Sequence, residues 1–330
     1  MGELQYRIVE GESDANDPAR TENYPAGANG GPDSLCGDAI VGLCQIFMDL
    51  TIRLMHVGDI PTGLHLCRLS RWNQLEEDWR AFLGSPDGGG WLAERGGTAV
   101  GTITFLRYGP CFSWLSMMLV HPDTRRAGIG TRLMDAALGA LAGETCVRLD
   151  ATSLGEPLYR RFGFSGEYEL VRAKVAAPSG RFGPLPENVR PMGTHDLAEV
   201  FTRDCIVFGA DRSMLLASFY HRAPDLAWTM HRGGTLLGYC FGRPGYLYRQ
   251  LGPVVAEDAA VARDIVSRCL AGQPGEDLAV DVPRSARGWI AWLESVGFIV
   301  ERPFLRMCRG QKQCPGLAAQ QFAIAGPEFG

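Results

Sequence analysis

One short segment of the sequence has the residue types that bind a phosphate group: Arg125, Arg126, Ala127, Gly128, Ile129, Gly130 and Thr131. It follows an apolar, strand-like stretch over 114–120 and opens a stretch with helical spacing. The first turn of a helix has free N–H groups and the positive end of the helix dipole, both of which attract anions. Glycine lets a pyrophosphate approach the backbone, and the arginines add positive charge. The alternative is a tight turn into a helix with two solvated arginines.

The elements that position this segment can be predicted from hydrophobic spacing. Alternating or continuous apolar runs predict strands over 52–55, 91–94, 99–108, 112–120, 146–150 and 167–175. A spacing of three and four predicts helices over 59–83, 128–142 and 157–162. Residues 84–90 are predicted to be a turn, because all seven are Gly, Pro, Ser or Asp, in a row between periodic stretches.

Two blocks of this half resemble the GNAT superfamily of N-acetyltransferases. Arg125, Gly128 and Gly130 fill the fixed positions of its loop signature, after Leu119-Val120-His121-Pro122. Downstream, Leu158-Tyr159-Arg160-Arg161-Phe162-Gly163-Phe164 resembles a second block of the family. The resemblance covers about 50–176. It implies an α/β (α+β) fold with a mixed, mostly antiparallel central sheet flanked by helices, and acetyl-CoA as cosubstrate.

The same resemblance implies roles for single residues. The backbone of Met118, Leu119 and Val120 would hold the pantetheine arm and the thioester carbonyl, while the loop from Arg125 to Thr131 would hold the pyrophosphate. Tyr159 matches the position that protonates the leaving thiolate. The alternative for Tyr159 is a side chain that packs one helix face with its hydroxyl in solvent.

The acceptor side is less defined. Many family members have a glutamate on the strand before the loop, but 114–120 contains no acid. A water chain to Glu94, Asp150 or Ser116 is an alternative, and the sequence does not choose among them. Trp72 and Asn73 lie where acceptor-side helices are found in the family, although Trp72 fits a core position better.

The second half repeats the first. Ile52, Arg53 and Asp59 match Val189, Arg190 and Asp196, and Gly101 matches Gly238, both at a shift of 137 residues. Gly163-Phe164 matches Gly297-Phe298 at a shift of 134, and 148–150 resembles 279–281. Matches in the same order at a nearly constant offset indicate two copies of one fold.

These patterns predict five segments. Residues 1–47 are a disordered leader, because 1–37 contain few large apolar residues. The short apolar stretch over 39–50 is either a fragment of helix or part of this leader. A catalytic GNAT domain spans 48–176, a linker rich in Pro and Gly spans 177–187, a degenerate GNAT-like domain spans 188–310, and a tail spans 311–330. Short matches at 150–152, 208–212 and 325–330 resemble two-domain bacterial GNAT proteins.

The second copy has lost the chemistry of the first. Glu257 and Asp258 stand where the glycine loop would be, and Leu293 takes the place of Tyr159. It is expected to complete the acceptor pocket or to form the surface of a homodimer. Asp211 and Arg212 are a candidate polar pair for the acceptor, or else a surface salt bridge.

Composition excludes several classes of protein. A net charge of -5 does not favour nucleic-acid binding, and the longest apolar runs are too short to span a membrane. The 10 cysteines form no C-x-x-C pair, and the six histidines are dispersed, so no metal site is expected. Cysteines in apolar stretches (Cys67, Cys111, Cys146, Cys240 and Cys269) are expected to be free thiols, which predicts a reducing cytoplasm.

Three functions follow from the sequence. The leading one is transfer of an acetyl group from acetyl-CoA to the amine of a small molecule. The alternatives are a protein or peptide N-acetyltransferase and a non-catalytic acyl-CoA sensor. The missing strand glutamate favours the sensor, whereas Tyr159 opposes it.

Overall fold

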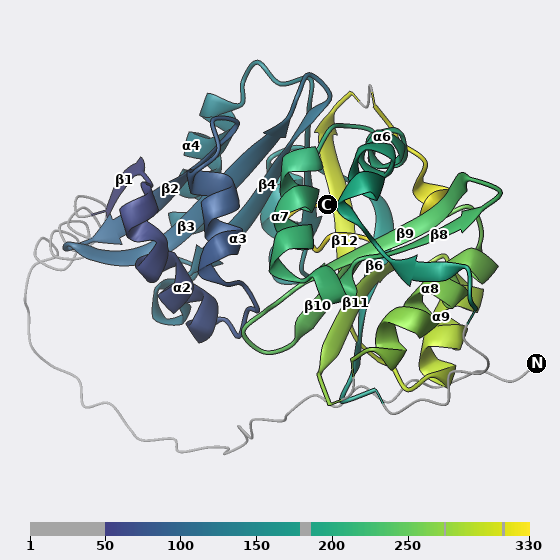
Figure 1. The fold of residues 1–330 in the computed structure, drawn as a ribbon. Helices are drawn as coiled ribbons and strands as arrows, with labels where there is room; N and C mark the ends of the chain where they lie inside the picture. Colours follow the sequence, from purple (N-terminus) through teal and green to yellow (C-terminus); the bar gives the residue numbers. More distant parts are fainter. Residues whose placement is uncertain (1–49, 179–185, 274, 312–313) are drawn as a thin grey trace, which may run out of the picture. The chain divides into compact units, whose positions relative to one another are not determined.

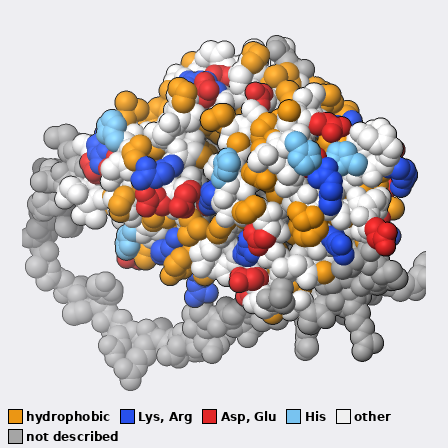
Figure 2. Space-filling model, viewed as in Figure 1, with side chains coloured by type: hydrophobic (Ala, Val, Ile, Leu, Met, Phe, Trp, Pro, Cys, Tyr) orange, Lys and Arg blue, Asp and Glu red, His pale blue; other side chains and the backbone are white. Residues whose placement is uncertain are grey.

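The computed structural model describes residues 50–178, 186–273, 275–311 and 314–330, and Figure 1 shows their fold. The leader predicted for 1–47 and most of the linker predicted for 177–187 lie outside the described residues. None of the described helices is long and apolar enough to cross a membrane. On the face seen in Figure 2, acidic and basic side chains are interspersed.

The first half follows the predicted order of strands and helices. Its elements are β1 (Leu50–Leu54), α2 (Ile60–Leu69), α3 (Glu76–Leu83), β2 (Gly88–Arg95), β3 (Thr98–Tyr108), β4 (Phe112–Val120), α4 (Ile129–Ala140), β5 (Cys146–Ala151), α5 (Glu156–Arg161) and β6 (Ser165–Val175). The turn predicted for 84–90 is wrong at its end, because β2 already begins at Gly88. Glycine fits there because a Cβ at Gly90 would lie 2.7 Å from the Ile103 carbonyl oxygen on the neighbouring strand.

The second half has the same order of elements. They are β7 (Val189–Pro191), α6 (Leu197–Phe208), α7 (Ser213–Arg222), β8 (Trp228–Arg232), β9 (Thr235–Arg243), β10 (Arg249–Ala256), α8 (Ala259–Ala271), β11 (Leu278–Pro283), α9 (Arg287–Ser295), β12 (Ile299–Gly310) and β13 (Gln321–Ala323). The repeat seen in the sequence is therefore a repeat of the fold.

The matched residues of the two copies make the same contacts. Arg53 contacts Asp59 at 2.8 Å, and Arg190 contacts Asp196 at 2.6 Å. Each aspartate also accepts a hydrogen bond from the backbone N–H three residues before it, which closes the short 3-10 turn that leads into α2 or α6. The repeated Arg and Asp therefore fix the first turn of each half.

The matched glycines also have one role. A Cβ at Gly101 would lie 2.8 Å from the Leu119 carbonyl oxygen, and a Cβ at Gly238 would lie 2.7 Å from that of Val255. In both copies the glycine permits close approach between the strand and its partner, under the long helix of that half.

All strands of the described residues join one 13-stranded sheet. Its order is β1-β2-β3-β4-β5-β12-β6-β11-β10-β9-β8-β7, and β13 pairs with β10. The pairs β4–β5 and β10–β11 are parallel and the others are antiparallel. The predicted fold class, a mixed and mostly antiparallel sheet flanked by helices, is confirmed.

The two copies exchange their last strands. β12, from the second half, pairs with β5 of the first, and β6, from the first half, pairs with β11 of the second. β6 and β12 pair with each other at the centre of the sheet. The boundaries predicted at 176 and 188 therefore divide the sequence but not the sheet.

Packing also joins the halves. One core combines α2 and α3 with α6 and α7, through Trp79, Phe82, Phe208 and Phe219. A second core lies under α4 and α5, and a third under α8 and α9. Thus two helices of each half share a core, and the other two cover a part of the sheet that includes the last strand of the other half.

The segment predicted as a tail is an integral part of the fold. β13 lies beside β10, and Phe329 stacks on Phe82 with ring centroids 5.1 Å apart. The Tyr108 hydroxyl donates to the Phe329 carbonyl oxygen at 2.7 Å. Figure 1 shows the C-terminus between the two halves, next to α7 and β12.

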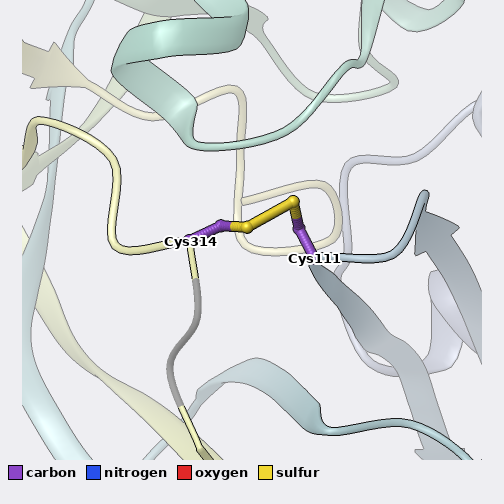
Figure 3. The surroundings of a disulfide bond; sticks show 2 residues. All are labelled: Cys111 and Cys314. Atoms are coloured by element: carbon purple, nitrogen blue, oxygen red, sulfur yellow. A yellow bond between two sulfur atoms is a disulfide. The ribbon is translucent and has the colours of Figure 1, made fainter.

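A disulfide joins this segment to the first half (Figure 3). Cys111, at the turn between β3 and β4, is bonded to Cys314, and their Cα atoms lie 5.5 Å apart. The expectation of a free Cys111 thiol is therefore wrong. The two residues are 203 positions apart, so only the folded chain brings them together. The cysteines consequently give no argument for a reducing compartment.

Candidate active site

The predicted phosphate-binding segment forms a loop between β4 and α4. A short turn, η2 (Pro122–Thr124), leads into it, and Arg126 and Gly128 have left-handed backbones, with φ of 64° and 77°. Gly128 is the N-cap of α4. Because the first N–H groups of a helix have no acceptor inside it, those at the start of α4 are available to an anion. The side chains of Arg125 and Arg126 are exposed beside them.

The two glycines of the loop differ in what surrounds them. A Cβ at Gly128 would meet no atom within 4 Å, so this residue is needed for its left-handed backbone. A Cβ at Gly130 would lie 3.1 Å from Leu158 Cδ2. Gly130 therefore lets α4 pack closely against α5, the helix that carries Tyr159.

A bulge interrupts β4 just before this loop. Thr102 pairs with Leu119 and Thr104 pairs with Ser116, so two residues of β4 face one residue of β3. Met117 has a φ of 49°, and its carbonyl oxygen accepts a hydrogen bond from Thr102 Oγ1 at 2.9 Å. A bulge turns the backbone out of the regular ladder. The N–H and C=O groups around Met118 are thereby redirected.

Beyond the start of β4, the sheet opens. β4 pairs with β5 only through Ser113 and Trp114, after which the two strands separate. A cavity that is partly open to solvent lies there. Its lining comes from both halves and consists of Trp72, Asn73, Gln74, Leu115, Ser116, Met117, Met118, Leu149, Asp150, Thr152, Tyr159, Arg172, Arg302, Phe304, Pro327 and Glu328.

Tyr159 is placed at this cavity by α5. Its side chain is 9% exposed and packs edge-on against Phe164, with ring centroids 6.1 Å apart. Burial raises the pKa of the Tyr159 hydroxyl. The phenol is therefore protonated at neutral pH and can act as a proton donor.

Comparison with known proteins identifies this arrangement. Acetyltransferase (GNAT) domain models match residues 86–166 and 200–323, and together these segments span more than half of the chain. The chain belongs to the GNAT acetyltransferases. Both halves match, so it is a tandem GNAT protein and an acyltransferase.

Similar proteins cover both GNAT halves. The uncharacterized N-acetyltransferase YitH of Bacillus subtilis is 24% identical over 229 residues, which are 69% of this chain and 80% of that protein. Holothin acyltransferase of a Pseudoalteromonas species is 25% identical, over 79% of this chain and 87% of that protein.

Solved structures have the same fold. A candidate acetyltransferase from Pyrococcus horikoshii has a TM-score of 0.70 at 22% identity, covering 86% of this chain and 96% of that one. A tandem GNAT protein from the clavulanic acid biosynthesis pathway has a TM-score of 0.55 at 15% identity, covering 79% of this chain and 98% of that one.

In the second GNAT half, the start of the corresponding helix α8 is not available to an anion. Asp258 is the N-cap of α8, and its carboxylate accepts hydrogen bonds from the N–H groups of Ala260 and Val261 at 2.8 and 2.9 Å. The amides that would bind a phosphate are thus occupied by a negative side chain. Leu293, in the place of Tyr159, is fully buried in the core.

The three candidates for the general base have different surroundings. Glu94 is bound to Arg53 at 2.9 Å and does not line the cavity. Ser116 lines it and shares a hydrogen bond of 2.9 Å with Thr104. Asp150 lines it too, but both of its oxygens accept hydrogen bonds from Arg306 at 2.9 Å. Burial raises the pKa of Asp150, and Arg306 opposes that rise.

The segment from Trp72 to Gln74 forms one wall. Trp72 lines the cavity and is partly buried. The Asn73 side chain donates to the Tyr248 carbonyl oxygen at 2.9 Å and accepts from the N–H of Leu247 at 2.8 Å. Asn73 therefore clamps the two halves together, and its amide is already engaged.

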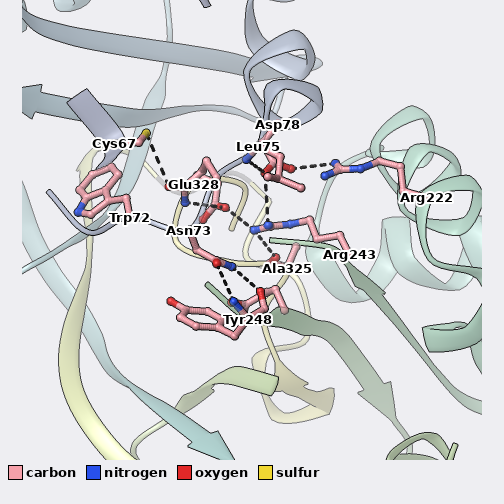
Figure 4. A network of polar contacts seen from close by, with 12 residues as sticks. Cys67, Trp72, Asn73, Leu75, Asp78, Arg222, Arg243, Tyr248, Ala325 and Glu328 are labelled. Atoms are coloured by element: carbon pink, nitrogen blue, oxygen red, sulfur yellow. Dashed lines mark hydrogen bonds and ion pairs between the residues drawn. The ribbon is translucent and has the colours of Figure 1, made fainter. Parts of the chain in front are cut away.

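A buried network of charges supports the same wall (Figure 4). Gln74 Nε2 donates to Glu328 Oε1 at 3.0 Å, and Arg243 donates to the same oxygen. Arg243 also lies 3.7 Å from Asp78, which accepts a hydrogen bond from Arg222 at 2.8 Å. This network links α3 to the second half and fixes Glu328 at the cavity.

Asp211 and Arg212 are elsewhere. Arg212 pairs with Asp204 at 2.8 Å, with side chains only 1% exposed, and donates to the Gly330 carbonyl oxygen at 2.8 Å. Asp211 caps α7 through the N–H of Ser213. Neither residue lines the cavity. The predicted polar pair is therefore not formed, because helix α6 supplies a better placed carboxylate.

Several lining residues could not be assigned from the sequence. Arg172, Arg302 and Phe304 come from the exchanged strands, and Pro327 and Glu328 come from the segment after β13. One weak signal pointed to Pro327 and Glu328, namely the resemblance of 325–330 to two-domain proteins. In the described residues, no cluster of three His, Cys, Asp or Glu side chains is placed to hold a metal ion.

Proposed function

We propose that the first GNAT half transfers the acetyl group of acetyl-CoA to the amine of a small molecule. The observation that carries this proposal is one cavity bounded by the β4 bulge, Tyr159 and Glu328. A redirected backbone, a proton donor and a carboxylate are the groups that aminolysis of a thioester requires.

The residues present fit the donor. Exposed arginines and free amides lie at the start of α4, and open space surrounds the Cβ position of Gly128. Arg125, Arg126 and the backbone from Ala127 to Thr131 would hold the pyrophosphate. The backbone of Met118, Leu119 and Val120 would hold the pantetheine arm. The donor supplies an acetyl thioester, which is activated toward an amine. One donor per chain is expected, since Asp258 occupies the second helix N-terminus.

Acetyl transfer from sulfur to nitrogen forms a C–N bond and breaks a C–S bond. One proton must therefore leave the nitrogen, and one must reach the sulfur. Tyr159 Oη is the proposed donor to the sulfur, because burial keeps it protonated. Glu328 is the proposed acceptor from the nitrogen. Among the described residues, hydrogen-bond donors contact only Oε1 of Glu328, which leaves its Oε2 able to accept a proton. Both oxygens of Asp150, by contrast, accept hydrogen bonds from Arg306.

A small acceptor fits better than a peptide. Pro327 and Glu328 of the second half close one side of the cavity, where a peptide would need an open groove. The relative named holothin acyltransferase supports a small acceptor as well. Tyr159 and Glu328 at the cavity favour catalysis over an acyl-CoA sensor.

Release of free thiol from acetyl-CoA across a panel of small amines and short peptides tests this proposal. The Gly128→Val substitution should weaken donor binding at least about 10-fold, because valine strains a left-handed backbone. Gly139→Val on the same helix is the matched control, since its Cβ would also meet no atom within 4 Å. Thiol release with peptides only, or with no amine at all, would contradict the proposal.

A further inference from the structure

We propose that the acceptor carries a carboxylate in addition to its amine, and that Arg302 binds this carboxylate. The inference rests on the proposed function and names the class of substrate. It starts from one guanidinium on the cavity wall that has no ionic partner among the described residues.

The strand register places Arg302 in an unfavourable position. Arg302 of β12 lies opposite Arg172 of β6, and both line the cavity. The register shifts at Glu301, between Val300 and Arg302. In a regular ladder Glu301 would face Arg172, and Arg302 would point to the other side of the sheet. The bulge thus replaces an acid with a second arginine, although like charges opposite each other destabilise a sheet.

Neighbouring charges do not compensate Arg302. They are paired among themselves: Asp281 with Arg172, Glu301 with Lys174, Asp150 with Arg306, and Asp78 and Glu328 with Arg222 and Arg243. No carboxylate oxygen of the described residues lies within 4.0 Å of the Arg302 guanidinium. Within the described part of the chain, one positive charge is therefore left over at the cavity wall.

The side chain is held in place without being neutralised. Its guanidinium lies over the Phe304 ring, 4.9 Å from the centroid, and Arg172 lies 5.3 Å from the same ring. Burial, together with the charge of Arg172, lowers the pKa of Arg302. A half-buried cation with a fixed orientation loses little entropy when it binds an anion.

The excess of one charge selects the kind of anion. A carboxylate neutralises it with two parallel hydrogen bonds from the guanidinium fork. A dianionic phosphate would leave a negative charge in a cavity that Asp150 and Glu328 already line. The amine of the same molecule would face the β4 bulge and Glu328. An aminocarboxylate therefore fits this wall better than a phosphorylated amine or a diamine.

Matched pairs of acceptors test this inference. The panel consists of glycine, β-alanine, 4-aminobutyrate and phenylalanine, each beside its carboxamide. We expect kcat/KM to favour at least one carboxylate by about 10- to 100-fold. Arg302→Met should remove that preference, and Arg302→Lys should retain part of it. Arg309→Met, on the same strand but exposed and outside the cavity, is the control.

Binding of the same amines, measured by calorimetry without acetyl-CoA, separates this inference from the proposed function. Carboxylate-selective binding that is lost in Arg302→Met supports the inference even if no acetyl group is transferred. Equal turnover and equal binding of both members of each pair would overturn it. It would also be overturned if Arg302→Met weakened acetyl-CoA binding and left acceptor preference unchanged. Melting temperature reports folding, and Arg302→Met should not lower it, because no ion pair is lost.

Discussion

Replacing Arg306 with methionine should destabilise the protein strongly, because Arg306 holds an exchanged strand in place. It lies on β12 and pairs with Asp150 on β5, with side chains 4% and 0% exposed. Its Nη1 also donates to the Tyr168 hydroxyl at 2.8 Å. Removing one partner of a buried pair leaves the other charge without compensation, which costs about 3–5 kcal/mol. That is a large share of an ordinary folding free energy.

The loss of folding stability expected for Arg306→Met depends on pH. Without Arg306, burial and the nearby charges of Asp281 and Glu167 remain, and they raise the pKa of Asp150 further. A group whose folded pKa exceeds its unfolded pKa stabilises the fold less as pH rises above the unfolded value. Arg306→Met should therefore be least destabilising near pH 4 and most destabilising near pH 8. Guanidinium chloride unfolding, followed by circular dichroism and tryptophan fluorescence, measures this.

A double-mutant cycle tests whether the two halves exchange their last strands, β6 and β12. Asp150→Asn and Arg306→Met should be coupled by about 2–3 kcal/mol, while Asp150→Asn and Arg172→Met should be nearly additive. The reason is that Arg172 pairs with Asp281, its cross-strand neighbour, at 2.7 Å. If each half kept its own last strand, Arg172 would instead be the partner of Asp150. A larger coupling between Asp150 and Arg172 would thus refute the exchanged arrangement.

Three further predictions concern single groups. Tyr159→Phe should lower kcat about 100-fold and leave donor affinity unchanged, and equal kcat in both proteins would exclude Tyr159 as the proton donor. Because the pKa of this hydroxyl is raised, its ionisation should not lower the wild-type kcat between pH 8 and 10. Reduction of the disulfide should lower the melting temperature of the wild type but not that of Cys111→Ser. The reason is that the disulfide joins residues 203 positions apart and contributes up to about 5 kcal/mol to the free energy of unfolding. Equal changes in melting temperature in the two proteins would contradict this. Arg190 lowers the pKa of Asp196 to about 2, so Asp196→Asn should cost about 2 kcal/mol at pH 7 in urea unfolding. The stability that a carboxylate with a lowered pKa contributes is lost as pH falls. The difference in free energy of unfolding between the wild type and Asp196→Asn should therefore disappear between pH 4 and 2.

Local features of the site could be predicted from the sequence because they depend on neighbouring residues. The strand 112–120 is β4, and the predicted helix after it is α4 with Gly128 as its cap. Tyr159 could be found because one short helix and the glycine after it fix its position. The loss of an anion site in the second half was visible in Asp258, which caps α8.

Features that join distant segments were decided by the tertiary structure. The sequence predicts two copies of one fold, but not which copy each last strand completes, since β6 and β12 carry similar patterns and fit either sheet. Long-range register places Arg302 at the cavity, and the segment after β13 brings Glu328 there. The Cys111–Cys314 disulfide also depends on this arrangement. The sequence by itself thus determined the proposed donor side of the site, which is built within about 50 residues. The proposed acceptor side is built from segments separated by more than 200 residues, and only packing of the two halves defines it.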